Sequence, residues 1–260
     1  MLYVENERFP FYRFSGLAMF PEINHFISSG AKDIGFSERM EPRLIRQNRC
    51  DLAEAVGTDM EKWIIAHQVH SANVAVVTVA EVGRGIWDQE SRIPDTDALV
   101  TADKGVGLMV MSADCVPVLF YDPVKQVIAA VHAGWRGTVA RIVMETVSIM
   151  QEKFDCCPGD IRAGIGPSIG KCCFEVSREV AQVFRNLFPE DGNVVFAGQK
   201  PDKYQIDLWE ANRLELLNTG LKPEHIEIAG ICTQCYPERF FSYRRDGKAA
   251  GRFGAGIILK

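Results

Sequence analysis

The chain has 260 residues, of which 47% are hydrophobic, and a formal net charge of −5. It is long and apolar enough for one large domain, and the absence of a basic block disfavours a nucleic-acid-binding protein. The sequence shows neither a signal-peptide pattern nor a run of about 18 apolar residues, so we expect a cytoplasmic protein without membrane contact.

The first hundred residues contain few regular patterns. Residues 1–50 are the least regular stretch, although a helix is predicted over 44–56 with Gly57 as its C-cap. The β-branched, partly alternating residues 63–80 indicate strand. The polar residues 83–97 predict a loop that is long enough to be functional.

Apolar runs and amphipathic segments alternate through the rest of the chain. Strands are predicted over 98–101, 106–112, 116–121, 127–131, 161–165, 226–232 and 252–259. Helices are predicted over 138–154, 178–188 and 208–218, with a loop over 189–204. No repeat or linker divides the chain, so we predict a single α/β domain over residues 1–260, with a mixed β-sheet flanked by helices.

The eight cysteines favour reduced thiols over a disulfide framework. They include two adjacent pairs, Cys156-Cys157 and Cys172-Cys173, and neighbouring cysteines do not easily reach disulfide geometry. The segment Cys232-Thr-Gln-Cys235 has no second pair at zinc-ribbon spacing and no following helix of a thioredoxin-like motif. We interpret Cys232 and Cys235 as two thiols at a strand end near the site.

Cys115 and His132 are the strongest candidates for chemistry, because each lies beside a predicted strand end. Asp114 places a charge between two apolar stretches, where an unpaired carboxylate would be costly. Arg136, at a predicted helix start after His132, provides a cation for an anion site. The alternatives are a buried cysteine without a chemical role and a hydrogen-bonded core histidine.

A second histidine could complete a metal site with these two residues. His67 and His70 are three residues apart on predicted strand and would point to opposite faces, and we favour His70 because a strand end follows it. His70, Cys115 and His132 together are a zinc ligand set that leaves one position for water or substrate. A metal-free pair of Cys115 as nucleophile and His132 as base is the alternative.

Two further segments have less specific patterns. The glycine-rich residues 163–170 match neither the dinucleotide fingerprint nor the P-loop. Residues 240–247 combine aromatic side chains with two arginines, which could stack on a base or contact phosphate, or could form a packed turn.

Six ordered motifs resemble the bacterial YfiH/YlmD family, which includes the human laccase-domain-containing protein. The motifs lie at 68–70, 95–101, 112–117, 132–137, 164–176 and 241–245. The resemblance runs from about residue 44 to the carboxyl terminus, whereas residues 27–33 depart from the family pattern.

The resemblance implies a YfiH-like fold with His70, Cys115 and His132 as metal ligands and Arg49 as a substrate contact. We expect Asp114 and Arg136 to help orient phosphate or base. The implied activities are phosphorolysis of purine nucleosides, including methylthioadenosine, and deamination of adenosine, so the expected partners are purine nucleosides and phosphate.

The older family label is copper-dependent polyphenol oxidase, or laccase. The chain has five histidines, too few for the copper cluster of a multicopper oxidase. A single Cys/His₂ site could accept copper, but an open zinc position explains hydrolytic chemistry more directly, because zinc lowers the pKa of a water ligand. A binding-only protein would leave the three potential ligands unexplained, and the sequence does not indicate an oligomeric state.

Overall fold

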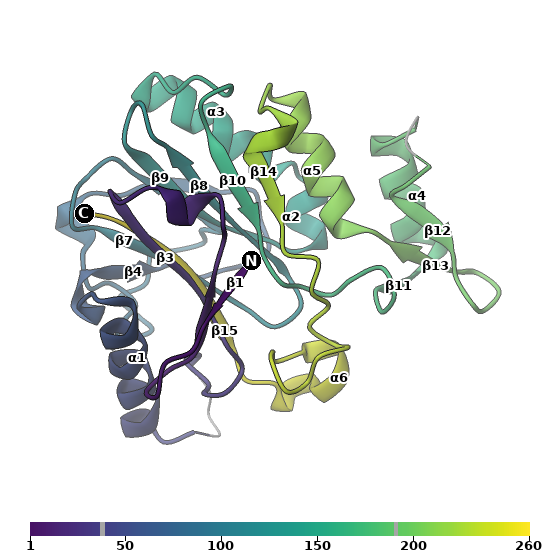
Figure 1. Cartoon of the computed structure of the whole chain (residues 1–260). Coiled ribbons are helices and arrows are strands. Elements are labelled where there is room, and N and C mark those ends of the chain that lie inside the picture. Colours follow the sequence, from purple (N-terminus) through teal and green to yellow (C-terminus); the bar gives the residue numbers. More distant parts are fainter. Residues whose placement is uncertain (37–39, 190–191) are drawn as a thin grey trace.

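The computed structural model describes residues 1–36, 40–189 and 192–260. Residues 190–191, part of the loop predicted over 189–204, lie outside the described residues, as do residues 37–39 in the irregular amino-terminal stretch. Two six-stranded sheets form the centre of the molecule, and a small third sheet lies to one side (Figure 1).

The first sheet joins the two ends of the chain. Its strands, in spatial order, are β1 (Leu2–Val4), β2 (Phe11–Arg13), β3 (Ile23–Ser28), β15 (Phe253–Leu259), β7 (Gly107–Ser112) and β4 (Trp63–Ile65). All its pairs are antiparallel except β4 with β7, which is parallel.

The second sheet combines parallel and antiparallel pairs. Its strands, in spatial order, are β14 (Ile226–Ile228), β10 (Arg162–Ile165), β8 (Val116–Asp122), β9 (Val127–Ala133), β6 (Ala98–Thr101) and β5 (Val74–Val76). The two outer pairs are parallel, and the inner pairs are antiparallel.

Side-chain alternation along the strands explains why the two sheets pack face to face. On β7, Leu108 and Val110 point into a core shared with Leu119 and Tyr121 of β8, whereas Met109 points to the opposite face. Helix α1 (Pro42–Val56) covers the outer face of the first sheet through Leu52 and its neighbours. The order of layers is therefore helix, sheet, sheet, helix.

The remaining helices lie over the second sheet or beside it. They are α2 (Trp135–Val139), α3 (Ile142–Phe154), α4 (Arg178–Leu187), α5 (Leu208–Asn218) and α6 (Tyr243–Asp246). Apolar residues of α3 and α5 cover the outer face of the second sheet. The third sheet, ordered β11 (Glu175–Ser177), β13 (Lys203–Ile206) and β12 (Val195–Ala197), forms a side lobe with α4 (Figure 1).

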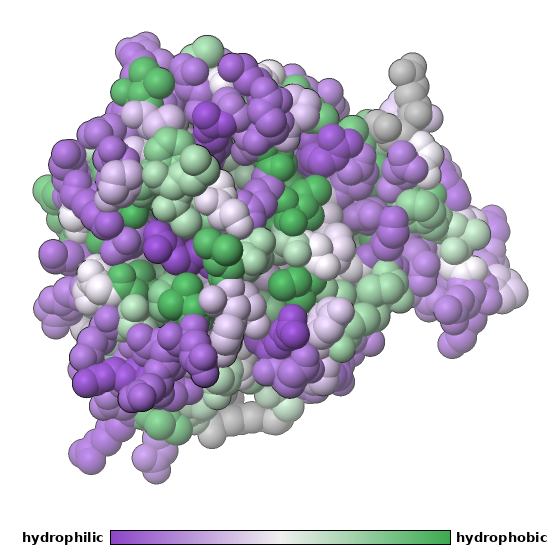
Figure 2. Space-filling model, in the orientation of Figure 1, coloured by the Kyte–Doolittle hydropathy of each residue, from purple (hydrophilic) through white to green (hydrophobic). Residues whose placement is uncertain are grey.

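Five short 3₁₀ turns complete the described elements. They are η1 (Leu17–Met19), η2 (Met60–Lys62), η3 (Val79–Glu81), η4 (Pro223–His225) and η5 (Gly247–Ala249). No helix among the described residues is long and apolar enough to cross a membrane. On the face shown in Figure 2, hydrophobic residues form small groups among hydrophilic ones.

The single α/β domain with helices flanking β-sheet is confirmed, but the β-structure consists of several sheets and not one. The helix over 44–56 is confirmed, with Gly57 as its left-handed cap at a φ of 76°. The predicted helix over 138–154 was wrong in one respect: it divides into α2 and α3 because Arg141 adopts a left-handed conformation, with a φ of 62°.

Four other sequence predictions need correction. The irregular first 50 residues contain β1, β2 and β3, and the predicted loop over 189–204 contains β12. The strand predicted over 63–80 is two short strands, β4 and β5, and the strand predicted over 226–232 ends at Ile228. These strands are three to six residues long and gain their stability from partners distant in the sequence, so local patterns identify them poorly.

Candidate metal centre and pocket

The structure brings His70, Cys115 and His132 together. One ligand atom from each lies within 4.8 Å of the others. Cys115 directly precedes β8 and His132 lies near the end of β9; because these strands are antiparallel neighbours, with Pro117 opposite His132, both side chains come from the same end of the sheet. The rings of His70 and His132 meet edge to face, with centroids 4.9 Å apart.

His70 reaches the site from the loop between β4 and β5, and not from a strand. Gln68 anchors this loop through two hydrogen bonds of 2.8 Å to the backbone of Met111. The backbone of His70 is left-handed, with a φ of 63°. His67 lies outside the site, with half of its side chain exposed and its Nδ1 atom 3.5 Å from Asp95.

Asp97, directly before β6, contacts both histidines. Its buried carboxylate accepts hydrogen bonds from the backbone N–H groups of Val69, His70 and Ser71, and Oδ1 lies 2.9 Å from Nδ1 of His132. Burial alone would raise the pKa of Asp97, but hydrogen bonds from His132 and from the hydroxyl and backbone N–H of Ser71, together with the positive charge of His132, lower it to about 2. An anionic Asp97 favours a proton on Nδ1 of His132, which leaves Nε2 free to face Cys115 or a metal ion.

The Cys115 thiol is readily ionised. Burial opposes ionisation, but the positive charge of His132 and hydrogen bonds from both histidines lower the pKa of Cys115 to about 6. The reverse holds at His132, where burial lowers the pKa but the thiolate and Asp97 raise it to about 9. A thiolate is the form that binds metal and the form that acts as a nucleophile.

Gly134 allows the ligands to approach each other. A Cβ atom at this position would lie 3.0 Å from Sγ of Cys115 and 3.0 Å from Cδ2 of His70. These distances are shorter than ordinary van der Waals contacts. The lack of a side chain at Gly134, directly after β9, therefore leaves room for Cys115 and His70 to lie close together.

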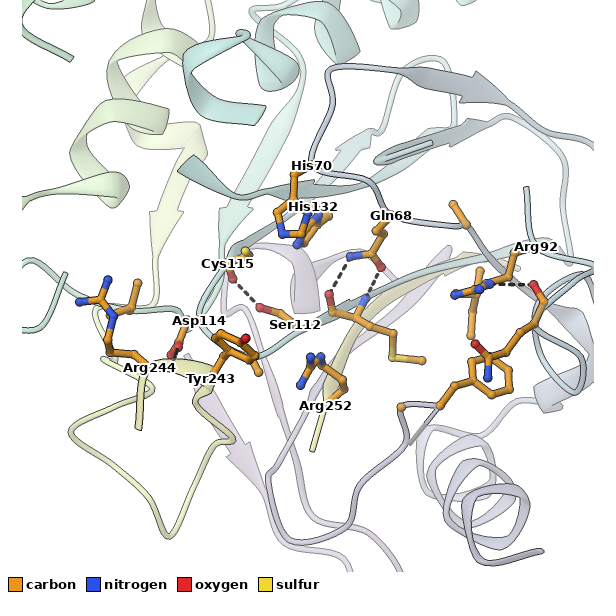
Figure 3. Close-up of a pocket in the computed structure, with 18 of the residues that line it drawn as sticks. Gln68, His70, Arg92, Ser112, Asp114, Cys115, His132, Tyr243, Arg244 and Arg252 are labelled. Carbon is orange, nitrogen blue, oxygen red and sulfur yellow. Dashed lines mark hydrogen bonds between the residues drawn. The ribbon is translucent and has the colours of Figure 1, made fainter. Parts of the chain in front are cut away.

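His70, Cys115 and His132 line a cavity of about 570 Å³. Its lining includes three arginines, Arg92, Arg244 and Arg252, and three aromatic residues, Phe36, Phe174 and Tyr243. Figure 3 shows Tyr243 and Arg252 across the cavity from the histidines. A volume of this size accommodates a small organic ligand, and the mixture of cationic and aromatic groups suits an anion beside a planar ring.

The three residues expected to contact substrate, Asp114, Arg49 and Arg136, lie in different surroundings. Asp114 lines the cavity, but its carboxylate accepts hydrogen bonds of 2.6 Å from the Thr233 hydroxyl and from the backbone N–H of Arg244. Asp114 therefore holds two segments of the cavity wall together. The backbone of Asp114 has a φ of 100°, which is an unusual conformation for a residue other than glycine.

Arg49 and Arg136, the other two residues expected to contact substrate, are not among the residues that line this cavity. Arg49 is fully buried, donates to the backbone carbonyls of Ile34 and Ile86, and stacks on Phe36 at 4.1 Å. Arg136 is exposed and lies over the ring of Trp135. Arg49 lies on the buried face of α1, and its guanidinium contacts the cavity lining through Phe36.

Sequence reasoning missed Asp97 as a site residue and Arg92 and Arg252 as cavity residues. Arg244 belongs to the aromatic and arginine segment whose role was left open. Asp97 lies within the family motif at 95–101, which was a usable signal. Arg252 lies directly before β15 and carries no local signal, because its position depends on the pairing of the chain ends.

Several known proteins are similar to this chain over most of its length. A family model described as multi-copper polyphenol oxidoreductase laccase matches residues 28–260. Purine nucleoside phosphorylase YlmD of Bacillus subtilis is 39% identical over 214 residues, covering 82% of this chain and 77% of that protein. A purine nucleoside phosphorylase of Bacteroides thetaiotaomicron is 34% identical over 256 residues, covering 95% of each chain.

Two further similarities extend the comparison. Adenosine deaminase RL5, from an unknown prokaryotic organism, is 36% identical over 212 residues, covering 82% of this chain and 80% of that protein. The crystal structure of YlmD from Geobacillus stearothermophilus superposes with a TM-score of 0.91 at 31% identity, covering 99% of this chain and 98% of that chain.

Proposed function

Because the chain belongs to the YfiH/YlmD family of laccase-domain proteins, we propose that it is a zinc-dependent purine nucleoside phosphorylase that also deaminates adenosine. We further propose that it cleaves methylthioadenosine. The observation that carries the proposal is a Cys/His₂ ligand set in the same cavity as three arginines. The names of relatives, purine nucleoside phosphorylase and adenosine deaminase, support both reactions.

The donor set fits zinc. Zinc prefers thiolate and imidazole ligands, and a three-ligand site keeps a position open for water or substrate. The ionised Cys115 and the Asp97–His132 contact supply the charge and orientation that such a site requires. When bound, the metal would supply a Lewis acid at the end of the cavity.

The remaining residues would bind and orient the two substrates. Arg252 and Arg92 provide cationic donors for phosphate, and Tyr243 and Phe174 provide surfaces for the purine. In phosphorolysis, a phosphate oxygen forms a bond to C1′ of the ribose while the bond from C1′ to the base breaks, and the base leaves with the bonding electrons. Fixing both substrates in one cavity lowers the entropic cost of this step.

A metal-free role for Cys115 is the second candidate function. The lowered pKa of Cys115 and the raised pKa of His132 describe a thiolate–imidazolium pair, which is also the resting state of a cysteine hydrolase. Copper-dependent phenol oxidation has less support. Among the described residues only one group of potential metal ligands contains histidine, so this chain offers no cluster of several coppers.

The decisive experiment combines metal analysis with product analysis. The purified protein should convert adenosine to adenine and ribose 1-phosphate when phosphate is present, and to inosine without it. Cys115→Ser should lose both metal and activity, while Cys50→Ser, which changes an exposed thiol on α1, should retain both. Full activity after exhaustive chelation, with inactivation by iodoacetamide, would favour the metal-free candidate.

A further inference from the structure

A second group of four cysteines comes together outside the lining of the cavity. Cys172 and Cys173 lie in the turn that precedes β11, and Cys232 and Cys235 lie in the segment after β14. Their four Sγ atoms all lie within 4.8 Å of one another. The missing second pair of the Cys-x-x-Cys segment is therefore the adjacent pair Cys172-Cys173, which the fold supplies from a distant part of the chain.

The separations between sulfur atoms match a shared metal ion better than a disulfide. Sγ of Cys235 lies 3.6 Å from Sγ of Cys172 and 3.4 Å from Sγ of Cys173. A disulfide bond would bring two sulfurs to about 2.05 Å. Four sulfurs around a tetrahedral zinc ion, with Zn–S bonds of about 2.3 Å, lie about 3.8 Å apart.

The backbone around Cys232 is arranged as in a site that stabilises thiolates. The N–H of Gly170 donates to Sγ of Cys232 at 3.3 Å, and Ser168 forms a β-bridge with Cys232. A Cβ atom at Gly170 would lie 3.0 Å from the Trp209 ring and 3.3 Å from Cβ of Cys232, so glycine permits this close approach. Hydrogen bonds from backbone N–H groups favour the charged form of sulfur.

We propose that Cys172, Cys173, Cys232 and Cys235 bind one zinc ion as a tetrathiolate, separate from the His70, Cys115 and His132 site. A closed set of four sulfur ligands is typical of structural zinc, whereas an open set of three is typical of catalytic zinc. Binding releases the thiol protons, since only thiolates coordinate the ion. Cys172 and Cys235 are exposed, so zinc can reach the site from solvent.

The proposed zinc would fasten two segments that build the cavity wall. The first segment contributes Phe174 to the cavity lining, directly after Cys173. The second leads to Arg244, whose Nη1 donates to the carbonyl oxygens of Cys173 at 3.0 Å and Glu175 at 3.2 Å. The tetrathiolate would therefore position Phe174 and Arg244 relative to each other, although no cysteine of the cluster lines the cavity.

The test is zinc stoichiometry in protein purified under reducing conditions from zinc-supplemented cells. We expect two zinc ions per chain in the unchanged protein and one in Cys115→Ser. The double variant Cys172→Ser/Cys235→Ser should also hold one zinc, and this ion should disappear when Cys115→Ser is added. Cys157→Ser, an exposed cysteine outside both groups, is the matched control and should retain two.

A measurement on the unchanged protein covers the case in which the double variant does not fold. Cysteines bound to zinc should resist alkylation in the native protein and become reactive once a chelator removes the metal. Mass spectrometry should find this protection at Cys172 and Cys235, the two exposed cysteines of the cluster, and Cys157 should be alkylated with or without the chelator. Because alkylation of the cluster cysteines is measured separately from alkylation of Cys115, this result does not depend on purine turnover.

Two outcomes would overturn the proposal. One is a single zinc per chain that disappears with Cys115→Ser while alkylation of Cys172 and Cys235 is unaffected by chelator. The other is a disulfide between two of the four cysteines in protein kept reduced throughout purification, which would make the cluster a redox pair.

Discussion

Asp97→Asn tests how the metal centre is held together. Oδ1 of Asp97 accepts from the backbone N–H of His70 at 3.0 Å and lies 2.9 Å from Nδ1 of His132. Oδ2 accepts from the N–H groups of Val69, at 3.2 Å, and Ser71, at 2.7 Å. An asparagine must turn its NH₂ group toward one of these two sets of donors, so either orientation places N–H against N–H.

The expected loss follows from these contacts. If the NH₂ group faces His132, the histidine must move its proton to Nε2 and can no longer offer that nitrogen to the metal. If it faces Val69 and Ser71, the loop that carries His70 loses the two hydrogen bonds that Oδ2 accepts from their backbone N–H groups. Changes in residues that orient metal ligands typically reduce metal affinity by about 10- to 100-fold, which corresponds to about 1.4–2.8 kcal/mol.

The assay is zinc affinity, measured by competition with a chromophoric chelator on the unchanged protein and the variant. Asp95→Asn is the matched control, because its side chain is 73% exposed and contacts only the solvent-facing His67 at 3.5 Å among the contacts in the described structure. It should bind zinc as the unchanged protein does. A folded Asp97→Asn protein with unchanged zinc affinity would refute the positioning role of Asp97.

Three further predictions follow from single positions. Gly134→Ala should weaken zinc binding while the protein stays folded, because the new methyl group lies 3.0 Å from two ligand side chains; zinc titration with a thermal melt measures both effects. Arg252→Ala should reduce kcat/KM for phosphate by about 10- to 100-fold, as expected for losing a charged hydrogen bond, whereas Arg136→Ala, outside the cavity lining, should not; equal losses would contradict this assignment. Burial raises the pKa of Glu215 to about 8, so the folded state keeps a proton that the unfolded state releases above about pH 4.5. The free energy of unfolding should therefore fall as pH rises from about 5 to 8, and Glu215→Gln should remove this fall, which urea unfolding at both pH values would detect.

Local sequence patterns predicted a helix or strand correctly where the hydrophobic residues of that element follow a clear pattern. The helix over 44–56 and the strands beginning at Ala98, Val116 and Val127 were predicted within one or two residues. Each has a continuous apolar run or an amphipathic face, and Gly57 supplies the left-handed residue that ends the helix. The amino-terminal strands have no such pattern, because β3 mixes Asn24 and His25 into its apolar residues and depends on pairing with β15.

Some residues of the site could likewise be predicted from the sequence, and others could not. The choice of His70, Cys115 and His132 rested on their residue types and on strand ends, because few side chains bind metal or act as nucleophiles. The roles of charged residues were harder to predict. Arginine and aspartate occur throughout the surface of a protein, and only their neighbours in space show whether a guanidinium is buried under Phe36, as Arg49 is, or reaches the cavity, as Arg252 does.

The sequence by itself determined the α/β class, the family and the chemical identity of the three potential ligands, because these depend on residue types and on order along the chain. Only the tertiary structure decided that Asp97 connects the two histidines and that two cysteine pairs form one cluster. Both features join residues that are distant in the sequence. Such contacts arise when whole strands pair and sheets pack, so no local pattern records them.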